Sequence, residues 1–211
     1  MINLKSQLQV LSQKLHGELY YDNLYKALYA TDASVYREFP LAVAIPSDNE
    51  DLKTLIHFAN DNKVSLMPRA AGTSLAGQCV GHGIVVDVSK NFNNIIEINS
   101  VEHWVRVQPG VIRDQLNTVL EPLGLFFGPN TSTANRCTIG GMVGNNSCGS
   151  TSIVYGDTRR HTKEIQAILS DGSQVVFKDL SKQEFLDKLK LNTLEGHLYR
   201  HIHDELSNKE L

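Results

Sequence analysis

Cysteine is scarce in this chain of 211 residues, and the spacing of the three cysteines argues against the sites that cysteines usually build. Cys79, Cys137 and Cys148 are odd in number and include no Cys-x-x-Cys pair. A disulfide framework or a zinc site needs paired cysteines, and iron–sulfur ligands come in tighter clusters. We therefore expect small buried thiols in a reduced protein and no metal site.

Long apolar runs and an excess of basic charge are also absent. No stretch approaches the roughly 20 apolar residues that cross a bilayer, and residues 1–15 lack the basic start and apolar core of a secretory signal. The net charge of −3 gives no sign of a basic surface, so no nucleic-acid partner is expected. The sequence favours a cytoplasmic protein, which a partner can hold at the periphery of the inner membrane.

The residues that are present, 41% hydrophobic and 20% charged, are typical of a folded globular protein. Apolar spacing predicts helices and strands that alternate early and antiparallel strands later. Helices are predicted at residues 2–15, 23–29 and 112–120, twice within 182–211, and after a capping box formed by Ser47 and Glu50. Strands are predicted at residues 41–45, 64–67, 84–88, 94–98, 104–107, 165–169 and 174–177.

This order of elements is typical of the α+β class, here with two α/β subdomains. We expect a helical lead-in over residues 1–36, a first subdomain over residues 37–100 and a second subdomain over residues 101–211. No linker separates the two subdomains, so the internal boundary is placed near residue 100.

The loop at residues 68–77 lies between two predicted strands and suits an anion. Gly72 and Gly77 allow positive φ and a close approach of the backbone, and Thr73 and Ser74 offer hydroxyls. Successive N–H groups in such a loop can form a nest for a pyrophosphate. Neither a P-loop nor Gly-x-Gly-x-x-Gly is present. On loop chemistry alone, an ordinary tight connection between strands is an equal alternative.

A second segment, residues 128–162, is long, rich in Gly, Asn, Ser and Thr, and predicted to lack regular structure. Ordered loops of this length are usually functional. Its glycines remove side chains along one surface, where a flat ring can approach the backbone, and its amides and hydroxyls suit a ring edge of carbonyls and N–H groups. No carboxylate interrupts residues 128–156, which favours an anionic ligand. A disordered polar loop is the alternative.

Here the residues resemble a known family. Segment 68–78 (Pro-Arg-Ala-Ala-Gly-Thr-Ser-Leu-Ala-Gly-Gln) is similar to the pyrophosphate loop of the vanillyl-alcohol-oxidase, or p-cresol methylhydroxylase (PCMH), type of FAD-binding domain. Segment 137–149 (Cys-Thr-Ile-Gly-Gly-Met-Val-Gly-Asn-Asn-Ser-Cys-Gly) resembles the second flavin-contacting segment of that family. Segment 29–36 (Tyr-Ala-Thr-Asp-Ala-Ser-Val-Tyr) resembles the lead-in of its D-lactate and D-2-hydroxyglutarate dehydrogenase branch.

The resemblance implies that this chain binds FAD through both segments. The first loop has no histidine for covalent attachment, so non-covalent FAD is expected. The residues expected to bind the cofactor are Pro68, Arg69, Ala70, Ala71, Gly72, Thr73, Ser74, Leu75, Gly77, Pro129, Thr133, Thr138, Gly140, Gly141, Asn145, Asn146, Gly149 and Tyr155.

Relatives in this family continue beyond the segments that match here. They carry another Gly-rich segment that closes the FAD domain, then a cap domain with the substrate-binding and catalytic residues, and in many cases a Cys-rich iron–sulfur region. The resemblance therefore implies a second subdomain that is incomplete in this chain and no catalytic residue within it. The cap and the iron–sulfur region are expected partners, in the same or a separate chain.

The expected reaction is the oxidation of a D-2-hydroxy acid, such as D-lactate or D-2-hydroxyglutarate, by a flavin dehydrogenase. One alternative is a flavoenzyme of the same fold with another substrate, such as an enolpyruvyl-sugar reductase that uses NADPH. The other alternative is a non-catalytic FAD-binding subunit or a vestigial fragment. His197 and His201 have the i, i+4 spacing of a metal pair, but a solvated helix face is the favoured interpretation.

Overall fold

The computed structural model describes residues 4–207, which form two compact units that divide between His161 and Thr162. The predicted helix residues 2–3 and the last predicted helical residues, 208–211, lie outside the described part. The expected subdomain boundary near residue 100 falls within the first unit and stays a prediction. None of the helices within residues 4–207 is long and apolar enough to cross a membrane.

The first unit contains a four-stranded sheet in the order β1-β2-β4-β3. β2 (Ala42–Ile45), β4 (Ile84–Asp87) and β3 (Leu66–Arg69) are parallel, and β1 (Glu18–Tyr20) is antiparallel to β2. All residues of β2 and β4 are buried, as expected for central strands of a parallel sheet that is covered on both faces. The predicted strands 41–45, 64–67 and 84–88 are thereby confirmed, within a residue or two.

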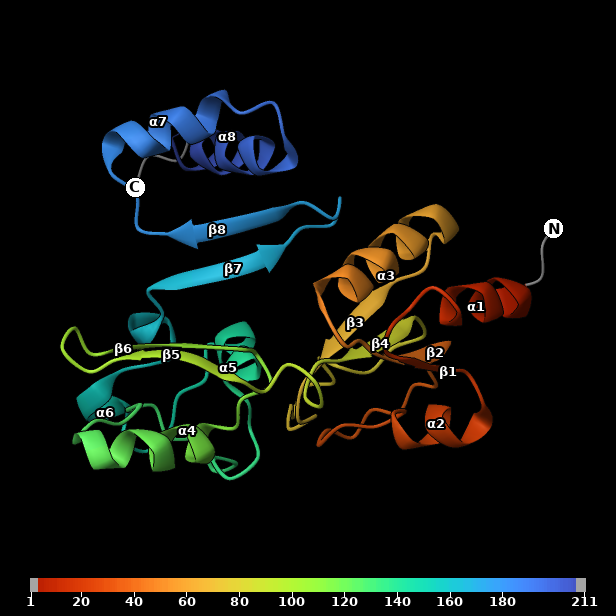
Figure 1. Cartoon of the computed structure of the whole chain (residues 1–211), viewed down its shortest axis with the longest axis horizontal. Helices are drawn as coiled ribbons and strands as arrows, with labels where there is room; N and C mark the ends of the chain where they lie inside the picture. Colours follow the sequence, from red (N-terminus) through yellow and green to blue (C-terminus); the bar gives the residue numbers. More distant parts are fainter. Residues whose placement is uncertain (1–3, 208–211) are drawn as a thin grey trace. The chain divides into compact units, whose positions relative to one another are not determined.

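Helices cover both faces of this sheet. α1 (Leu4–Ser12) and α3 (Asn49–Asn62) lie on one face, and α2 (Asn23–Leu28) lies on the other (Figure 1). A hydrophobic core lies between the sheet and the helices α1 and α3. Its buried side chains follow helical spacing on the helices and alternate positions on the strands. Its buried members are Leu8, Leu11, Leu15, Ala42, Ala44, Leu55, Ile84 and Val86.

The start of α3 differs from the prediction, because the N-cap is Asp48 rather than Ser47. The Asp48 carboxylate accepts the backbone N–H groups of Glu50 and Asp51 at 2.9 and 3.0 Å. An aspartate at this position also adds negative charge at the positive end of the helix dipole.

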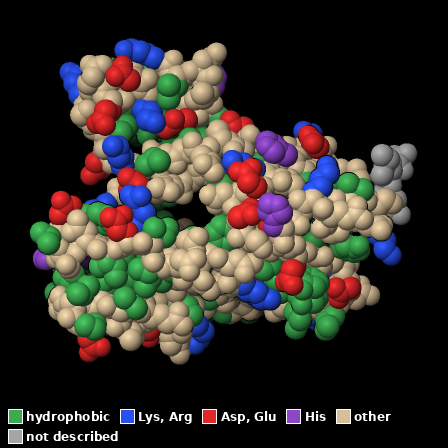
Figure 2. All heavy atoms as spheres, viewed as in Figure 1, with side chains coloured by type: hydrophobic (Ala, Val, Ile, Leu, Met, Phe, Trp, Pro, Cys, Tyr) green, Lys and Arg blue, Asp and Glu red, His purple; other side chains and the backbone are tan. Residues whose placement is uncertain are grey.

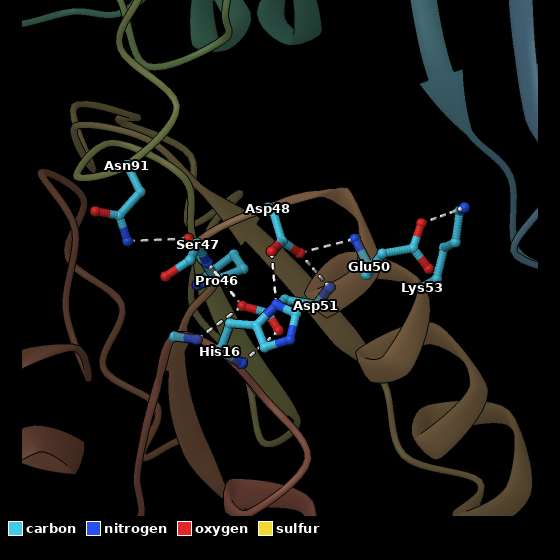
Figure 3. A network of polar contacts seen from close by, with 9 residues as sticks. His16, Pro46, Ser47, Asp48, Glu50, Asp51, Lys53 and Asn91 are labelled. Carbon is cyan, nitrogen blue, oxygen red and sulfur yellow. Dashed lines mark hydrogen bonds and ion pairs between the residues drawn. The ribbon is translucent and has the colours of Figure 1, made fainter.

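A polar network joins this helix start to the chain that leaves α1 (Figure 3). Asp51 is 1% exposed, and its carboxylate accepts the backbone N–H groups of His16, Gly17 and Ser47 at 2.8 to 2.9 Å. His16 Nδ1 lies 2.7 Å from Asp48 Oδ2. The three side chains are close enough to hold a metal ion, but every carboxylate oxygen already accepts a hydrogen bond from the protein. The network therefore fastens the segment between α1 and β1 to the start of α3.

The rest of the first unit is built on the antiparallel pair β5 (Ile95–Asn99) and β6 (Trp104–Val107) and the helix α4 (Arg113–Leu120). Their shared core has Val111, Leu116 and Leu120 at its centre. A short 3₁₀ turn, η1 (Glu121–Leu123), follows α4. Hydrophobic side chains gather on the visible surface over this region and, separately, over α2 (Figure 2).

The second unit is a hairpin with two helices. β7 (Glu164–Ile168) and β8 (Gln174–Lys178) pair in an antiparallel manner around a turn with Gly172 at φ +84°. α7 (Lys182–Lys190) starts at a capping box of Ser181 and Glu184, and α8 (Leu194–Ser207) follows. The aromatic ring of Tyr199 in α8 packs against Phe177 and Phe185. The hairpin and both helices were predicted from the sequence.

The segment 128–162 is more regular than predicted, and this expectation was wrong. It contains α5 (Ile139–Asn145), α6 (Ser152–Tyr155) and a 3₁₀ turn, η2 (Arg159–His161). The Thr138 hydroxyl caps α5 by accepting the N–H of Gly141 at 3.3 Å, and Met142 is buried beneath the helix. A side-chain cap and one buried anchor therefore suffice for a short helix in a glycine-rich sequence.

Candidate functional site

The first predicted loop leaves the C-terminal end of β3 and returns to β4. Both glycines that were expected to adopt positive φ do so, with +64° at Gly72 and +69° at Gly77. The Ser74 hydroxyl accepts the N–H groups of Ala76 and Gln78 and donates to the Gln78 side chain at 2.7 Å. These hydrogen bonds fix the middle of the loop, residues 74–78, while the Leu75 side chain is 80% exposed.

Arg69 is the last residue of β3, and its guanidinium interacts with the protein itself. Nη1 donates to the carbonyl oxygen of Thr31 at 2.8 Å, and Cζ lies 5.2 Å from the centre of the Tyr29 ring. A Cβ added at Gly72 would lie 2.5 Å from Nη2 of this guanidinium and would displace it, and the φ of +64° at Gly72 also favours glycine. The Arg69 guanidinium thus lies between the lead-in and the first bend of the loop, and a direct contact between Arg69 and the cofactor stays a prediction.

The second segment is folded around α5. Gly140 packs against Pro109, where an added Cβ would lie 2.8 Å from the Pro109 Cα. Thr133 holds the approach to the helix, because its carbonyl oxygen accepts the N–H groups of Arg136 and Cys137 at 2.9 and 2.7 Å. Thr138, 2% exposed, caps the helix and is therefore oriented toward the backbone.

The two predicted loops meet in this structure. A Cβ added at Gly141 in α5 would lie 3.4 Å from the Cβ of Ala70 in the first loop, which is ordinary van der Waals contact. Gly144, one turn further along α5, faces open space, since an added Cβ would have no neighbour within 4 Å among the described residues. The helix therefore offers a surface without side chains that begins beside the first loop.

No packing contact within residues 4–207 requires a glycine at position 144. A glycine inside a helix costs about 0.5–1 kcal/mol relative to alanine. Gly140 is explained by its contact with Pro109, but the exposed Gly144 is not explained by any contact within the described chain. A bare helix surface of this kind fits a flat ligand that lies directly against the backbone.

Asn146 ends α5 and fixes the chain that follows. It has φ +47°, its side-chain oxygen accepts the N–H of Arg159 at 2.9 Å, and its side-chain nitrogen donates to Asp157 at 3.1 Å. The hydrogen bond from Asn146, with that from the backbone of Arg160, lowers the pKa of Asp157. The amide of Asn146 is therefore engaged within the protein, whereas Asn145 is exposed and donates to Ser147 at 3.3 Å. Flavin contacts of both amides stay predictions.

The other predicted residues lie around the second segment. The carbonyl oxygen of Pro129 accepts a hydrogen bond from Arg113 Nε at 3.1 Å, and the Tyr155 ring packs edge-on against Phe126. Gly149 approaches the backbone of Asn130 so closely that no side chain fits there. A cavity of about 390 Å³ opens at this point and is lined by Asn130, Thr131, Ser132, Cys148, Gly149 and Ser150.

A wider and more open hollow, of about 610 Å³, lies elsewhere and contains none of the predicted residues. It is lined by Asp114, Asn117, Thr118, Glu121, Gly124, Leu125 and Phe126. Two carboxylates disfavour a pyrophosphate there. The two loops therefore stay the candidate site, since residues 128–156 carry no acidic side chain.

The expectation for the cysteines is corrected at one position. Cys79 and Cys137 are buried and free, but Cys148 is exposed. It lies in the extended stretch after α5, where the chain leaves the core, and no apolar neighbour covers it in the sequence Asn-Asn-Ser-Cys-Gly-Ser.

Sequence reasoning missed the residues that hold the first loop from outside. Tyr29, Asp32 and Tyr36 belong to the lead-in, and Asp87 ends β4. The sequence did contain two indications of these residues. The lead-in was recognised as a distinctive segment, and Asp87 is a carboxylate at the end of a buried apolar strand. Neither fact reveals that the two segments touch.

Comparison with known proteins decides the family. The model of the family described as "FAD binding domain" matches residues 40–178, which include both loops. This chain belongs to the FAD-binding domain family. Its cofactor is FAD, and the resemblance stated from the sequence is confirmed. The bare surface of α5 and the anion-compatible loops fit this cofactor.

The chain is similar to two curated enzymes in particular. It is 43% identical over 162 residues to D-2-hydroxyglutarate dehydrogenase of Pseudomonas putida, which covers 75% of this chain and 16% of that protein. It is 32% identical over 152 residues to glycolate oxidase subunit GlcD of Bacillus subtilis, covering 71% and 32% respectively. The chain thus spans about a sixth to a third of the length of these relatives.

Solved structures show the same fold. p-Cresol methylhydroxylase aligns with a TM-score of 0.71 at 16% identity, over 82% of this chain and 35% of that one. Alkyldihydroxyacetonephosphate synthase aligns with a TM-score of 0.72 at 17% identity, over 83% and 38%. The predicted α+β fold of the PCMH type is confirmed.

Proposed function

We propose that this chain is the FAD-binding part of a dehydrogenase that oxidises a D-2-hydroxy acid, with D-2-hydroxyglutarate as the first candidate. The observation that carries the proposal is the 43% identity to D-2-hydroxyglutarate dehydrogenase, together with the close approach of Ala70 and Gly141, which brings the two predicted loops side by side. The similarity to glycolate oxidase subunit GlcD supports a small 2-hydroxy acid as the substrate class.

FAD supplies the two-electron oxidant of the proposed reaction. A D-2-hydroxy acid loses a hydride equivalent from C2 and a proton from its hydroxyl group, which leaves the 2-oxo acid. In this chain, the loop after β3 binds the pyrophosphate, and the glycine surface of α5 accepts the ring. We propose that the base for the hydroxyl proton lies outside these 211 residues, in the part of the relatives that this chain does not match.

The same proposal covers the partners and the mode of binding. A substrate-binding cap, and an iron–sulfur region that accepts electrons, act with this domain in the same or a separate chain. The word "subunit" in the name of the Bacillus subtilis relative favours a multichain arrangement. FAD is held without a covalent bond, since residues 68–77 contain no histidine. We place the enzyme in the cytoplasm, held at the membrane only by a partner.

A complementation experiment tests this function. The 211-residue chain is combined with the remainder of the Pseudomonas putida relative, either fused to it or added as a separate chain. Under anaerobic conditions, D-2-hydroxyglutarate should bleach the flavin bands, while the L enantiomer should not. D-lactate and glycolate serve as alternative substrates, and NADPH tests the reductase alternative.

The outcomes distinguish the dehydrogenase from the reductase and from the non-catalytic subunit. Bleaching by any D-2-hydroxy acid supports the proposal and ranks the substrates. Bleaching by NADPH alone would contradict it in favour of the reductase. Bound flavin that none of these compounds reduces in the complemented protein would favour a non-catalytic FAD-binding subunit.

A further inference from the structure

The segment between α2 and β2 touches the first cofactor loop at several separate points. The N–H of Ala33 donates to the carbonyl oxygen of Gly72 at 3.1 Å. The Tyr36 ring covers Gly77, where an added Cβ would lie 2.7 Å from the ring. These contacts involve the two loop residues that adopt positive φ.

A further contact fixes the end of the loop. The Cys79 thiol, 8% exposed, lies 3.6 Å from Oδ2 of Asp32. Thr31 pairs with Arg37 in an isolated antiparallel bridge, and the N–H of Glu38 donates to the carbonyl oxygen of Ala30 at 2.8 Å. Residues 29–38 therefore form a closed turn with its own hydrogen bonds, and this turn lies along the loop.

We propose that residues 29–38, here named the lead-in clasp, hold the pyrophosphate loop in its binding shape before FAD arrives, with Tyr29 and Arg69 as positioning residues. The inference rests on FAD binding alone and is independent of the substrate. It assigns the lead-in a role toward the cofactor, and it makes Arg69 a support of the loop.

The link between the clasp and the sheet is the pair of Tyr29 and Asp87. The Tyr29 hydroxyl donates to Oδ2 of Asp87 at 2.6 Å. Asp87 is 5% exposed, and its other oxygen accepts the N–H and the hydroxyl of Ser89 at 2.8 and 2.6 Å. Because a buried carboxylate needs these partners, the position of the Tyr29 ring is set by the end of β4.

The ring then sets the position of Arg69. Arg69 and Asp87 are direct neighbours in the register of β3 and β4. The guanidinium lies over the Tyr29 ring, donates to Thr31 and packs beneath Gly72. A planar guanidinium can stack on a ring with its face while N–H groups in its plane donate hydrogen bonds, and an ammonium group lacks this planar arrangement. The chain of contacts therefore runs from β4 through Tyr29 and Arg69 to the first bend of the loop.

A loop held in this way should bind pyrophosphate more tightly than a mobile one, because less conformational freedom is lost on binding. The proposal predicts that loosening the clasp mobilises residues 70–80 in the protein without FAD, while the core strands stay protected. A purely structural role for Tyr29 predicts instead that protection falls throughout the sheet.

Amide hydrogen exchange of the 211-residue chain without FAD tests the proposal. Tyr29→Phe removes the hydroxyl that donates to Asp87, and Arg69→Lys keeps the positive charge but removes the planar guanidinium. Tyr25→Phe is the matched control, since Tyr25 stacks on Tyr20 outside the clasp. In both test variants, exchange in residues 70–80 should accelerate about tenfold, as expected for a lost hydrogen bond to a charged group. The control should match the parent chain.

The same variants are then titrated with FAD by fluorescence quenching. Affinity should fall about tenfold in Tyr29→Phe and Arg69→Lys and stay unchanged in Tyr25→Phe. Unchanged exchange in residues 70–80 would overturn the proposal, and so would faster exchange that spreads equally over β2 and β4. If the parent chain binds no FAD, the exchange result alone still decides whether the clasp holds the loop.

Discussion

Replacing Gly144 by alanine separates stability from cofactor binding in a single substitution. The added Cβ meets no atom of the described protein within 4 Å, and the residue lies in α5 with an ordinary helical backbone. Alanine in a helix interior is favoured over glycine by about 0.5–1 kcal/mol. The free energy of unfolding should therefore rise by that amount, with an increase in Tm of roughly 1–4 °C.

The same methyl group should impair FAD binding. If the flavin lies against the bare surface of α5, a Cβ at residue 144 overpacks the contact at a cost of about 1–3 kcal/mol. The dissociation constant should then rise by roughly 5- to 150-fold. Calorimetry measures the stability, and fluorescence titration with FAD measures the affinity.

Two further variants complete this comparison. Thr118→Ala replaces an exposed helical residue of α4, so it should leave the affinity for FAD unchanged. Gly140→Ala should destabilise the protein, because its Cβ would collide with Pro109. A Gly144→Ala protein that is more stable and binds FAD as tightly as the parent would refute the placement of the flavin on α5.

Three other predictions concern the first unit. Asp51→Ala leaves three backbone N–H groups without their buried acceptor and should lower the free energy of unfolding by about 3 kcal/mol in denaturant titration; a loss near zero would contradict this role. The hydrogen bond and charge of Asp48 raise the pKa of His16 above 6.5. Their contact should therefore stabilise the fold while His16 is protonated and Asp48 is ionised, and it should fade as pH rises through the raised pKa of His16. A pH profile of stability that is the same in His16→Gln would contradict this. Cys148 should react with a thiol reagent in the native protein well before Cys79, because Cys148 is exposed and Cys79 is buried. Equal reaction rates would contradict the exposed position of Cys148.

The sequence predicted the elements whose signals are local. The short apolar runs at residues 41–45 and 84–88 favoured buried strands, and the turn around Gly172 marked the hairpin. The glycines at 72 and 77 were recognised as residues that allow positive φ, and both adopt it in the structure. The resemblance of the two loops to FAD-binding segments identified the cofactor before any contact was known.

What was missed depends on contacts between distant residues or on very short elements. β1 has three residues, too few for a periodic signal, and its antiparallel pairing with β2 joins segments that are distant in the sequence. α5 contains three glycines in seven residues, so propensity argued against a helix, yet the Thr138 cap and buried Met142 stabilise one. The engagement of Arg69 with Tyr29 and Thr31 requires the lead-in and the loop to touch, which no pattern within either segment reveals.

The most direct test is the visible absorption spectrum of the purified 211-residue chain after incubation with FAD and removal of free ligand. We predict retained flavin bands, because the first loop and α5 already meet at Ala70 and Gly141 within this chain. A colourless protein that circular dichroism shows to be folded would contradict the claim that these two segments form the FAD site by themselves.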